Sequence, residues 1–172
     1  MANAWFWKPL SISNVSATNT AAGFSPLYVA NDHAGVVWQS NGEANPFLIV
    51  DFGSDVAIDT VALFGLSGFT AAHVTTIAVA TSAQGSGFGA GAFTNFVSSI
   101  PVLAGTEMPV SGKGVGLYSV GGAIVGRYAK IIFASLPGAV QISRVAAGKR
   151  IQLERNFGFG GAFGVRDLGS VD

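Results

Sequence analysis

Short runs of β-branched and aromatic residues recur along the whole chain, separated by turns rich in Gly, Ser, Asn and Pro. No segment keeps the 3.6-residue spacing of apolar positions for three turns with the capping residues of a helix. Many short apolar runs between turns favour an antiparallel β-sandwich or barrel. The predicted strands are Leu10–Val15, Phe47–Phe52, Ile58–Phe64, Thr75–Ala80, Phe93–Val97, Gly116–Val120, Arg127–Phe133, Val140–Val145 and Arg150–Glu154.

Glycine-containing segments are predicted to form the turns and loops between these strands. Gly53–Asp55 separates two apolar runs and predicts a polar turn. The pair Gly121 and Gly122 predicts a hairpin turn. The segment Gly85–Gly91 predicts a surface loop. It is not typical of a phosphate-binding loop, because no helix follows it and no lysine stands where such a loop needs one.

Composition favours a single domain that works in an assembly. The chain has 172 residues, enough for a core that needs no covalent staple. Cysteine is absent, which excludes disulfides and a thiol nucleophile. Only 10% of the residues are charged, fewer than a soluble monomer usually carries on its surface. We therefore expect partners to cover part of the surface.

The zero net charge hides an asymmetry between the two halves of the chain. Residues 1–112 carry one basic and six acidic side chains, whereas residues 113–172 carry eight basic and three acidic ones. The basic residues of the second half are scattered among strands and do not form a run. This pattern indicates complementarity within or between subunits and argues against nucleic-acid binding.

The N-terminal segment predicts where the protein folds. It has no basic n-region, and its apolar run stops at Lys8 and Pro9, so it is not typical of a signal peptide. No stretch approaches the ~20 uninterrupted apolar residues of a membrane span. We therefore expect folding in a reducing cytoplasm, without membrane insertion.

Residues with catalytic chemistry do not form a recognisable constellation. His33 and His73 stand alone, outside any metal-ligand spacing, and no nucleophile elbow is present. Asp51, Asp55 and Asp59 recur every four residues, but on strands and turns that spacing does not place them on one face. We therefore expect these carboxylates to have structural roles in turns, and no enzymatic activity.

Aromatic residues near the N-terminus are candidates for ligand binding. Trp5 and Trp7 flank Phe6, and alternate residues of an extended segment point the same way. The two indoles are thus expected to form one aromatic face, which either stacks on a sugar ring, seats in a partner or packs against the domain's own sheet. Trp38 is expected to fill the core between the two sheets, together with Val50, Val61, Leu63 and Ile131.

Two segments resemble a known family. Residues Phe47–Phe64 contain a strand, an Asp, a Gly-containing turn and a second strand, and Arg127–Phe133 reads Arg-Tyr-Ala-Lys-Ile-Ile-Phe. Together with Trp38-Gln39-Ser40, these motifs resemble the discoidin family, also called the coagulation-factor type C family. The resemblance spans about residues 10–149 and implies a galactose-binding-like jelly-roll β-sandwich that binds ligands through its loops. It also implies that Tyr128 points into the domain.

The resemblance places a second candidate ligand site in the loop Asn31-Asp32-His33. Domains with this fold often hold a structural calcium there, and Asp32 is the matching carboxylate. Calcium takes six to eight oxygen ligands, however, and Asp32 has few anionic neighbours in sequence. We therefore favour an Asx-turn for Asp32 and expect no cofactor.

The C-terminal segment 150–172 lies outside the resemblance and is predicted to be an assembly extension. Phe157, Phe159 and Phe163 stand among glycines, with Arg155 and Arg166 beside them. Exposed phenylalanines are unfavourable, so the segment either packs back on its own sandwich or inserts into a neighbouring subunit.

These observations lead to a prediction for the whole chain. Residues 1–149 are expected to form the discoidin-like jelly roll, and residues 150–172 the extension. Cysteine-free, Gly-rich β proteins with such arms resemble bacteriophage virion proteins of tails and baseplates. We expect a non-enzymatic virion protein whose partners are its own copies, other virion proteins and a host-surface glycan. The alternatives are a soluble glycan-binding lectin module and an accessory binding domain of a glycan-processing enzyme.

Overall fold

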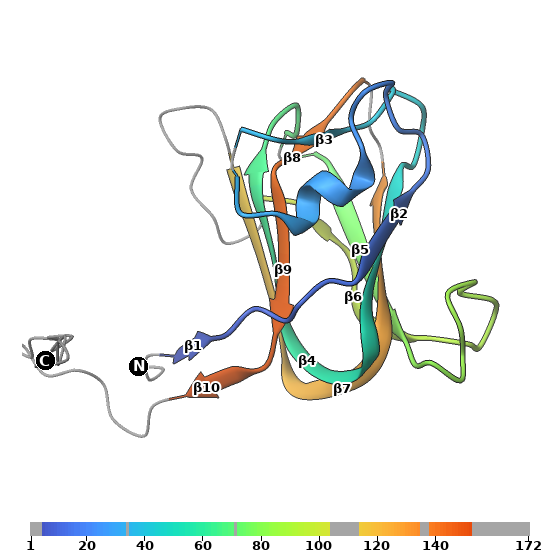
Figure 1. The fold of residues 1–172 in the computed structure, drawn as a ribbon, viewed down its shortest axis with the longest axis vertical. Helices are drawn as coiled ribbons and strands as arrows, with labels where there is room; N and C mark the ends of the chain where they lie inside the picture. Colours follow the sequence, from blue (N-terminus) through green and yellow to red (C-terminus); the bar gives the residue numbers. More distant parts are fainter. Residues whose placement is uncertain (1–4, 34, 71, 104–113, 135–137, 153–172) are drawn as a thin grey trace, which may run out of the picture.

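The computed structural model describes residues 5–33, 35–70, 72–103, 114–134 and 138–152. They form a β-sandwich of two antiparallel layers, seen edge-on in Figure 1. The elements are β1 (Trp5–Trp7), β2 (Asn14–Ala17), the 3-10 helix η1 (Pro26–Ala30), β3 (Trp38–Gln39), β4 (Phe47–Leu66), β5 (Val74–Ala80), β6 (Thr94–Pro101), β7 (Gly114–Ala134), β8 (Gln141–Ile142), β9 (Arg144–Gly148) and β10 (Arg150–Gln152).

Two long strands, β4 and β7, belong to both layers. They pair antiparallel along almost their whole length and bend together into a U at the lower end of the sandwich in Figure 1. In one layer the order is β2-β4-β7-β5-β6, formed by the first half of β4 and the second half of β7. In the other layer, residues 60–66 of β4 lie between β9 and residues 114–119 of β7. The short pair β3–β8 lies at the upper end.

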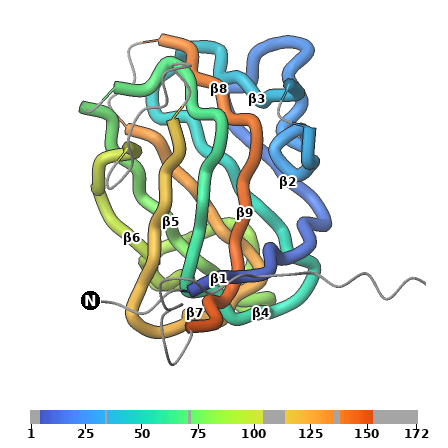
Figure 2. Tube along the Cα trace, turned by 90° about the vertical axis from the view of Figure 1, so that its left-hand side faces the viewer, coloured from blue at the N-terminus to red at the C-terminus, as the bar shows by residue number. Residues whose placement is uncertain are grey.

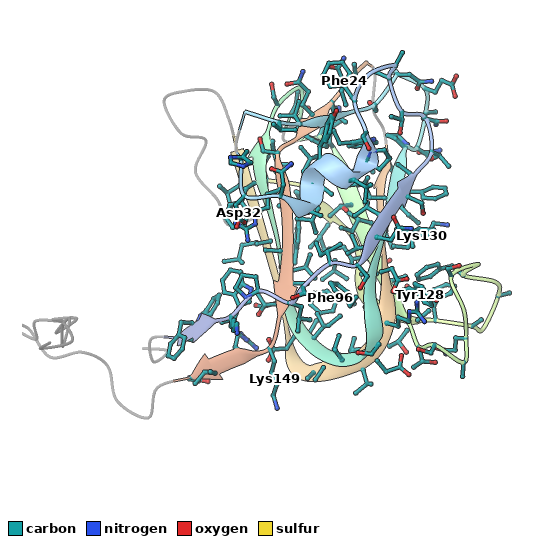
Figure 3. The ribbon with its side chains drawn as sticks, viewed as in Figure 1. Phe24, Asp32, Phe96, Tyr128, Lys130 and Lys149 are labelled. Atoms are coloured by element: carbon teal, nitrogen blue, oxygen red, sulfur yellow. The ribbon has the colours of Figure 1, made fainter. Side chains whose placement is uncertain are left out.

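The core lies between the two layers and is built from alternate residues of the strands. The predicted core residues Trp38, Val50, Val61, Leu63 and Ile131 are all buried in one cluster, which confirms that prediction. Phe96 of β6 points into the same space, as Figure 3 shows. Burial alternates along residues 47–52 of β4 and 128–134 of β7, whereas residues 58–63 of β4 and 145–148 of β9 are buried on both sides.

The predicted turn at Gly53–Asp55 and the hairpin at Gly121-Gly122 are both wrong. Both segments lie within continuous strands, where the β4–β7 register shifts. Residues 52–55 of β4 lie against the single residue Arg127 of β7, and residues 120–123 of β7 lie against the single residue Asp59 of β4. Such bulges bend a strand pair without reversing the chain, and they use the same glycine and polar residues as a turn.

Ion pairs hold the chain at these two bulges. The Arg127 guanidinium donates to both carboxylate oxygens of Asp51, at 2.8 and 2.9 Å. At the other bulge, the Arg150 guanidinium Nε lies 3.5 Å from Asp59 Oδ1, and the backbone N–H of Arg150 donates to the same oxygen at 2.8 Å. Within the first bulge, the Asp55 carboxylate accepts from the backbone N–H of Ser82 at 2.7 Å. The three evenly spaced carboxylates therefore have structural roles at the bend, as expected.

Three further segments differ from the prediction. β2 begins four residues later than expected, although Leu10 and Ile12 still pack against the core. The predicted strand Val140–Val145 is divided into β8 and β9. η1 was not predicted; it begins after Ser25, whose hydroxyl accepts from the Leu27 N–H, and Pro26 suits the first helical position. This helix contacts both β2 and β9, the edge strands of the two layers.

The N-terminal strand β1 pairs with β10 to form a two-stranded ribbon. The ribbon lies at the lower end of the sandwich, beyond β9, and crosses in front of it in Figure 2. Residues 150–152 are therefore part of the described structure, whereas the rest of the predicted strand Arg150–Glu154 lies outside it. No helix in the described ranges is long and apolar enough to span a membrane.

Candidate functional site

Trp5 and Trp7 lie side by side on one face of the β1–β10 ribbon, as predicted. Their ring centroids are 5.6 Å apart, the planes are tilted by 38°, and both side chains are half-buried. Phe6 points to the opposite face, where it is 53% exposed opposite Ile151 of β10. The ribbon thus presents a pair of indoles on one side and a smaller apolar pair on the other.

Arg150 holds a cation over this aromatic face. Its guanidinium carbon lies 5.6 Å from the Trp5 ring centroid. Its Nη2 donates to the Val120 carbonyl at 2.6 Å, and its Nε lies 3.5 Å from Asp59 Oδ1. Contacts from both long strands therefore fix the guanidinium in place before any ligand arrives.

Trp7 anchors the aromatic face to the body of the sandwich. A Cβ atom placed on Gly148 of β9 would lie 2.6 Å from Trp7 Cδ1, so the indole rests directly on this glycine. Trp7 Nε1 is buried and has no hydrogen-bond partner among the described residues. An unpaired buried donor of this kind is unfavourable.

The loop Asn31-Asp32-His33 follows η1 and forms a second polar site. Asn31 makes an Asx-turn, because its Oδ1 accepts from the His33 N–H at 2.8 Å. An Asx-turn of Asp32 would involve residue 34, which lies outside the described residues, so that assignment stays a prediction. The Asp32 carboxylate pairs with Arg144 of β9. The two side chains line a mainly polar hollow of about 210 Å³ that residues 9–12 complete, and the side chain of His33 is exposed.

The residues around Asp32 do not fit a calcium ion. Its carboxylate is paired with a guanidinium, which a cation would have to displace. Calcium also requires several oxygen ligands, and the described residues contain no group of three or more acidic, His or Cys side chains suited to a metal.

The sequence-based reasoning missed a third site, on the outer face of the layer that contains β2. Tyr128 does not point into the domain: it and Lys130 are half-buried on this outer face, whereas Ala129 and Ile131 are buried. In Figure 3 both side chains lie on the right, beside the loop of residues 81–93. Side chains alternate along a strand, so a buried Ile131 places Lys130 and Tyr128 on the outer face. The role that the family resemblance implies for Tyr128 led to the opposite prediction.

Two shallow hollows flank the loop 81–93 on this outer face. One, of about 130 Å³, is lined by Thr76, Ala78, Phe88, Phe93, Asn95, Lys130 and Ile132. The other, of about 170 Å³, is more polar and is lined by Asn14, Ser16, Ile49, Asp51, Ser86 and Tyr128.

The remaining predicted residues either have structural roles or lie outside the described part of the chain. His73 is buried, and its Nδ1 accepts from the Thr70 N–H at 2.7 Å. The predicted assembly residues Arg155, Phe157, Phe159, Phe163 and Arg166 lie outside the described residues, so their role stays a prediction. The same applies to the boundary at residue 149.

No protein-family model matches the sequence. No curated protein sequence matches it either.

Solved structures of several binding modules have the same fold. Chitosan-binding module 1 of a chitosanase/glucanase from Paenibacillus sp. IK-5 has a TM-score of 0.62 at 16% identity, covering 82% of this chain and 97% of the module. The family 32 carbohydrate-binding module of NanJ from C. perfringens, in complex with galactose, has a TM-score of 0.62 at 17% identity, covering 85% and 100%. A mutant lectin binding domain of lectinolysin, complexed with Lewis b, has a TM-score of 0.57 at 16% identity, covering 83% and 96%.

At these identities the similarity establishes the fold alone. The prediction of an all-β, galactose-binding-like jelly roll is confirmed. This fold is used by carbohydrate-binding and lectin modules, while a phage origin stays a prediction.

Proposed function

We propose that this protein is a non-catalytic glycan-binding module whose site is the Trp5–Trp7 face of the β1–β10 ribbon. The observation that carries the proposal is the geometry of this face: two half-buried indoles, 5.6 Å apart, with the Arg150 cation fixed over one of them. The structural similarity to chitosan-binding, galactose-binding and Lewis b-binding modules supports the same function.

The face has the groups that a sugar needs. One side of a pyranose ring presents apolar C–H groups, which pack on a flat aromatic ring, while its edge presents hydroxyls. Trp5 and Trp7 supply the aromatic surface. Arg150 supplies donors to hydroxyls at the ring edge, and its position is set by Asp59 and Val120.

The carboxylates favour a binding protein over an enzyme. Glycoside hydrolysis generally uses two carboxyl groups about 5–9.5 Å apart that act on one bond. Asp32, Asp51 and Asp59 are each paired with a different arginine. Such pairing suits structural carboxylates, and the proposal therefore includes no catalytic step.

A matched pair of variants tests the site. We expect the protein to bind at least one of galactose, chitosan oligosaccharides and Lewis b in isothermal titration calorimetry. Trp5→Ala should weaken that binding about tenfold, equivalent to ~1.4 kcal/mol, because it removes one aromatic contact. Phe6→Ala, on the opposite face of the same strand, should leave affinity unchanged. Equal losses in the two variants, or no binding to any of the three glycans, would contradict the proposal.

A second candidate function is that of a phage virion component that assembles through the same ribbon. The observation that favours it is the exposed pair Phe6 and Ile151, each 53% exposed, on a ribbon whose two strands pair only with each other among the described residues. Exposed apolar ribbons with open edges pair with other chains. Under this candidate, Phe6→Ala should lower the mass of the particle in sedimentation velocity, whereas Trp5→Ala should not.

A further inference from the structure

A lysine stands among apolar side chains in one part of a sheet face. On the outer face of the β2-containing layer, Lys130 of β7 stands opposite Ile49 of β4 and Ala78 of β5. Ala78 in turn stands opposite Asn95 of β6. Residues directly opposite on neighbouring strands share a face, so these four side chains form one row across the sheet.

The charge of Lys130 has no acidic partner within the described residues. Its Nζ lies 4.2 Å from the ring centroid of Phe47 and 5.7 Å from that of Phe88. The basic residues Arg127, Arg144 and Arg150, by contrast, each pair with an aspartate. Aromatic faces stabilise a half-buried ammonium in part, but they leave its positive charge uncompensated.

The loop 81–93 covers this lysine with two aromatic rings. Phe88 and Phe93 lie with their ring centroids 6.1 Å apart and line the hollow of about 130 Å³ beside Lys130. Phe88 has a φ of +49°, a left-handed conformation that is unfavourable for a residue other than glycine. Strained backbone of this kind persists where the position of a side chain matters, and here it places the ring over the sheet.

We propose that this hollow binds a carboxylate-bearing sugar unit, such as a uronic acid. The ammonium of Lys130 receives the carboxylate in a charge-assisted contact, and the surrounding aromatic rings lower the competition from water. Phe88 and Phe93 pack against the C–H face of the sugar ring. The side chains of Asn95 and Thr76 at the rim supply hydrogen-bonding groups for its hydroxyls.

The neighbouring polar hollow favours an acidic oligosaccharide as the full ligand. Tyr128, which lines it, is two residues from Lys130 on the same face of β7, and two residues of a strand span about 7 Å. Asn14, Ser16 and Ser86 add hydroxyl and amide groups there. The Asp51 carboxylate at this hollow is already paired with Arg127, so it does not leave an unpaired negative charge beside the lysine.

This site does not depend on the Trp5–Trp7 face. Lys130 and Tyr128 lie on the right of the sandwich in Figure 3, whereas the β1–β10 ribbon extends to the lower left. The two sites can therefore be removed one at a time.

The test compares two sugars that differ only at C6, D-glucuronate and D-glucose, in isothermal titration calorimetry with the full chain. We expect glucuronate to bind about tenfold more tightly than glucose, the effect of one charge-assisted contact. Lys130→Met keeps an unbranched side chain and should abolish that preference. Lys149→Met, at an exposed position labelled in Figure 3, should preserve it. Both variants should melt within a few degrees of the parent, because neither lysine forms an ion pair among the described residues.

The outcomes separate this site from the proposed glycan-binding face. Equal affinities for the two sugars, or a preference for glucuronate that survives in Lys130→Met, would overturn the inference. Trp5→Ala should leave glucuronate binding unchanged. Weaker glucuronate binding in this variant would also overturn the inference, because it would place the carboxylate at the β1–β10 ribbon. An oligosaccharide in which glucuronate alternates with a neutral sugar should bind more tightly than free glucuronate. If free glucuronate binds as tightly as the oligosaccharide, the ligand does not extend into the hollow lined by Tyr128.

Discussion

The three evenly spaced aspartates show how far individual residues can be interpreted. Their position between apolar runs indicated structural roles, and each one now has a partner at the bend of β4 and β7. The partners themselves were not predictable: Arg127 and Arg150 lie 76 and 91 residues away from Asp51 and Asp59. Local pattern identifies the need for a partner, whereas the topology of the fold decides which residue meets it.

Asp51→Asn should destabilise the protein at neutral pH, and the loss should vanish in acid. The Arg127 guanidinium, helped by the Gly53 N–H, holds the pKa of Asp51 below its ordinary value despite partial burial. A lowered folded-state pKa contributes stability above the unfolded value of about 3.9, and that stability is lost as the pH falls through the folded pKa. Melting curves of the two proteins should therefore differ at pH 7, and the difference should shrink below about pH 4 and vanish once the pH lies under the lowered folded-state pKa of Asp51.

Glu43→Gln serves as the control for this measurement. Glu43 is exposed and forms no ion pair within the described ranges, so its substitution should leave the melting temperature unchanged at both pH values. If the melting temperatures of the parent and Asp51→Asn differed by the same amount at every pH, the charge of the Asp51–Arg127 pair would not contribute to stability.

The ribbon β1–β10 depends on a single glycine of a neighbouring element. Gly148→Ala should displace Trp7, because the new methyl group would lie 2.6 Å from Trp7 Cδ1 and 2.8 Å from the Lys8 carbonyl oxygen. We expect a loss of about 1–3 kcal/mol in the free energy of unfolding, the usual cost of overpacking, and a change in tryptophan fluorescence.

Gly87→Ala is the matched control for that substitution. A Cβ at Gly87 meets nothing within 4 Å, so stability and fluorescence should stay those of the parent. If Gly148→Ala behaved like Gly87→Ala, Trp7 would not rest on β9.

Strands were easier to predict than the connections between them. Alternating apolar residues identified β5 almost to the residue, since Val74–Ala80 was expected at Thr75–Ala80. The bends at Gly53 and at Gly121-Gly122 were taken for turns, because a bulge and a turn share the same residue types. Only the pairing of β4 with β7 along both layers distinguishes the two, and pairing is a long-range property.

Surface sites of the whole molecule were predicted in part. Trp5 and Trp7 were recognised because they alternate within three residues, and the structure places them together. The hollow at Lys130 is assembled from β5, β6, β7 and the loop before β6, so no short stretch of sequence contains its pattern. Sites made by one segment can be recognised in sequence, whereas sites made by several require the fold.

The extension after β10 is best tested on a chain that keeps the ribbon intact. A protein ending after Gln152 retains Arg150 and its contacts with Asp59 and Val120, so it should fold with the melting temperature of the full chain. If residues 153–172 mediate assembly, the shortened protein should sediment as a monomer while the full chain forms larger species. Assembly of the shortened protein to the same size would place the interface elsewhere.

Glycan binding at the Trp5–Trp7 face can be followed in an NMR titration through the indole N–H signals of the three tryptophans. Trp38 is an internal control, because it is buried and its Nε1 donates to Thr20 Oγ1 at 3.0 Å. With galactose, a chitosan oligosaccharide or Lewis b, we expect the Trp5 and Trp7 signals to shift progressively while the Trp38 signal stays in place. Three unmoved signals with every glycan, or a Trp38 shift as large as the others, would contradict glycan binding at this face.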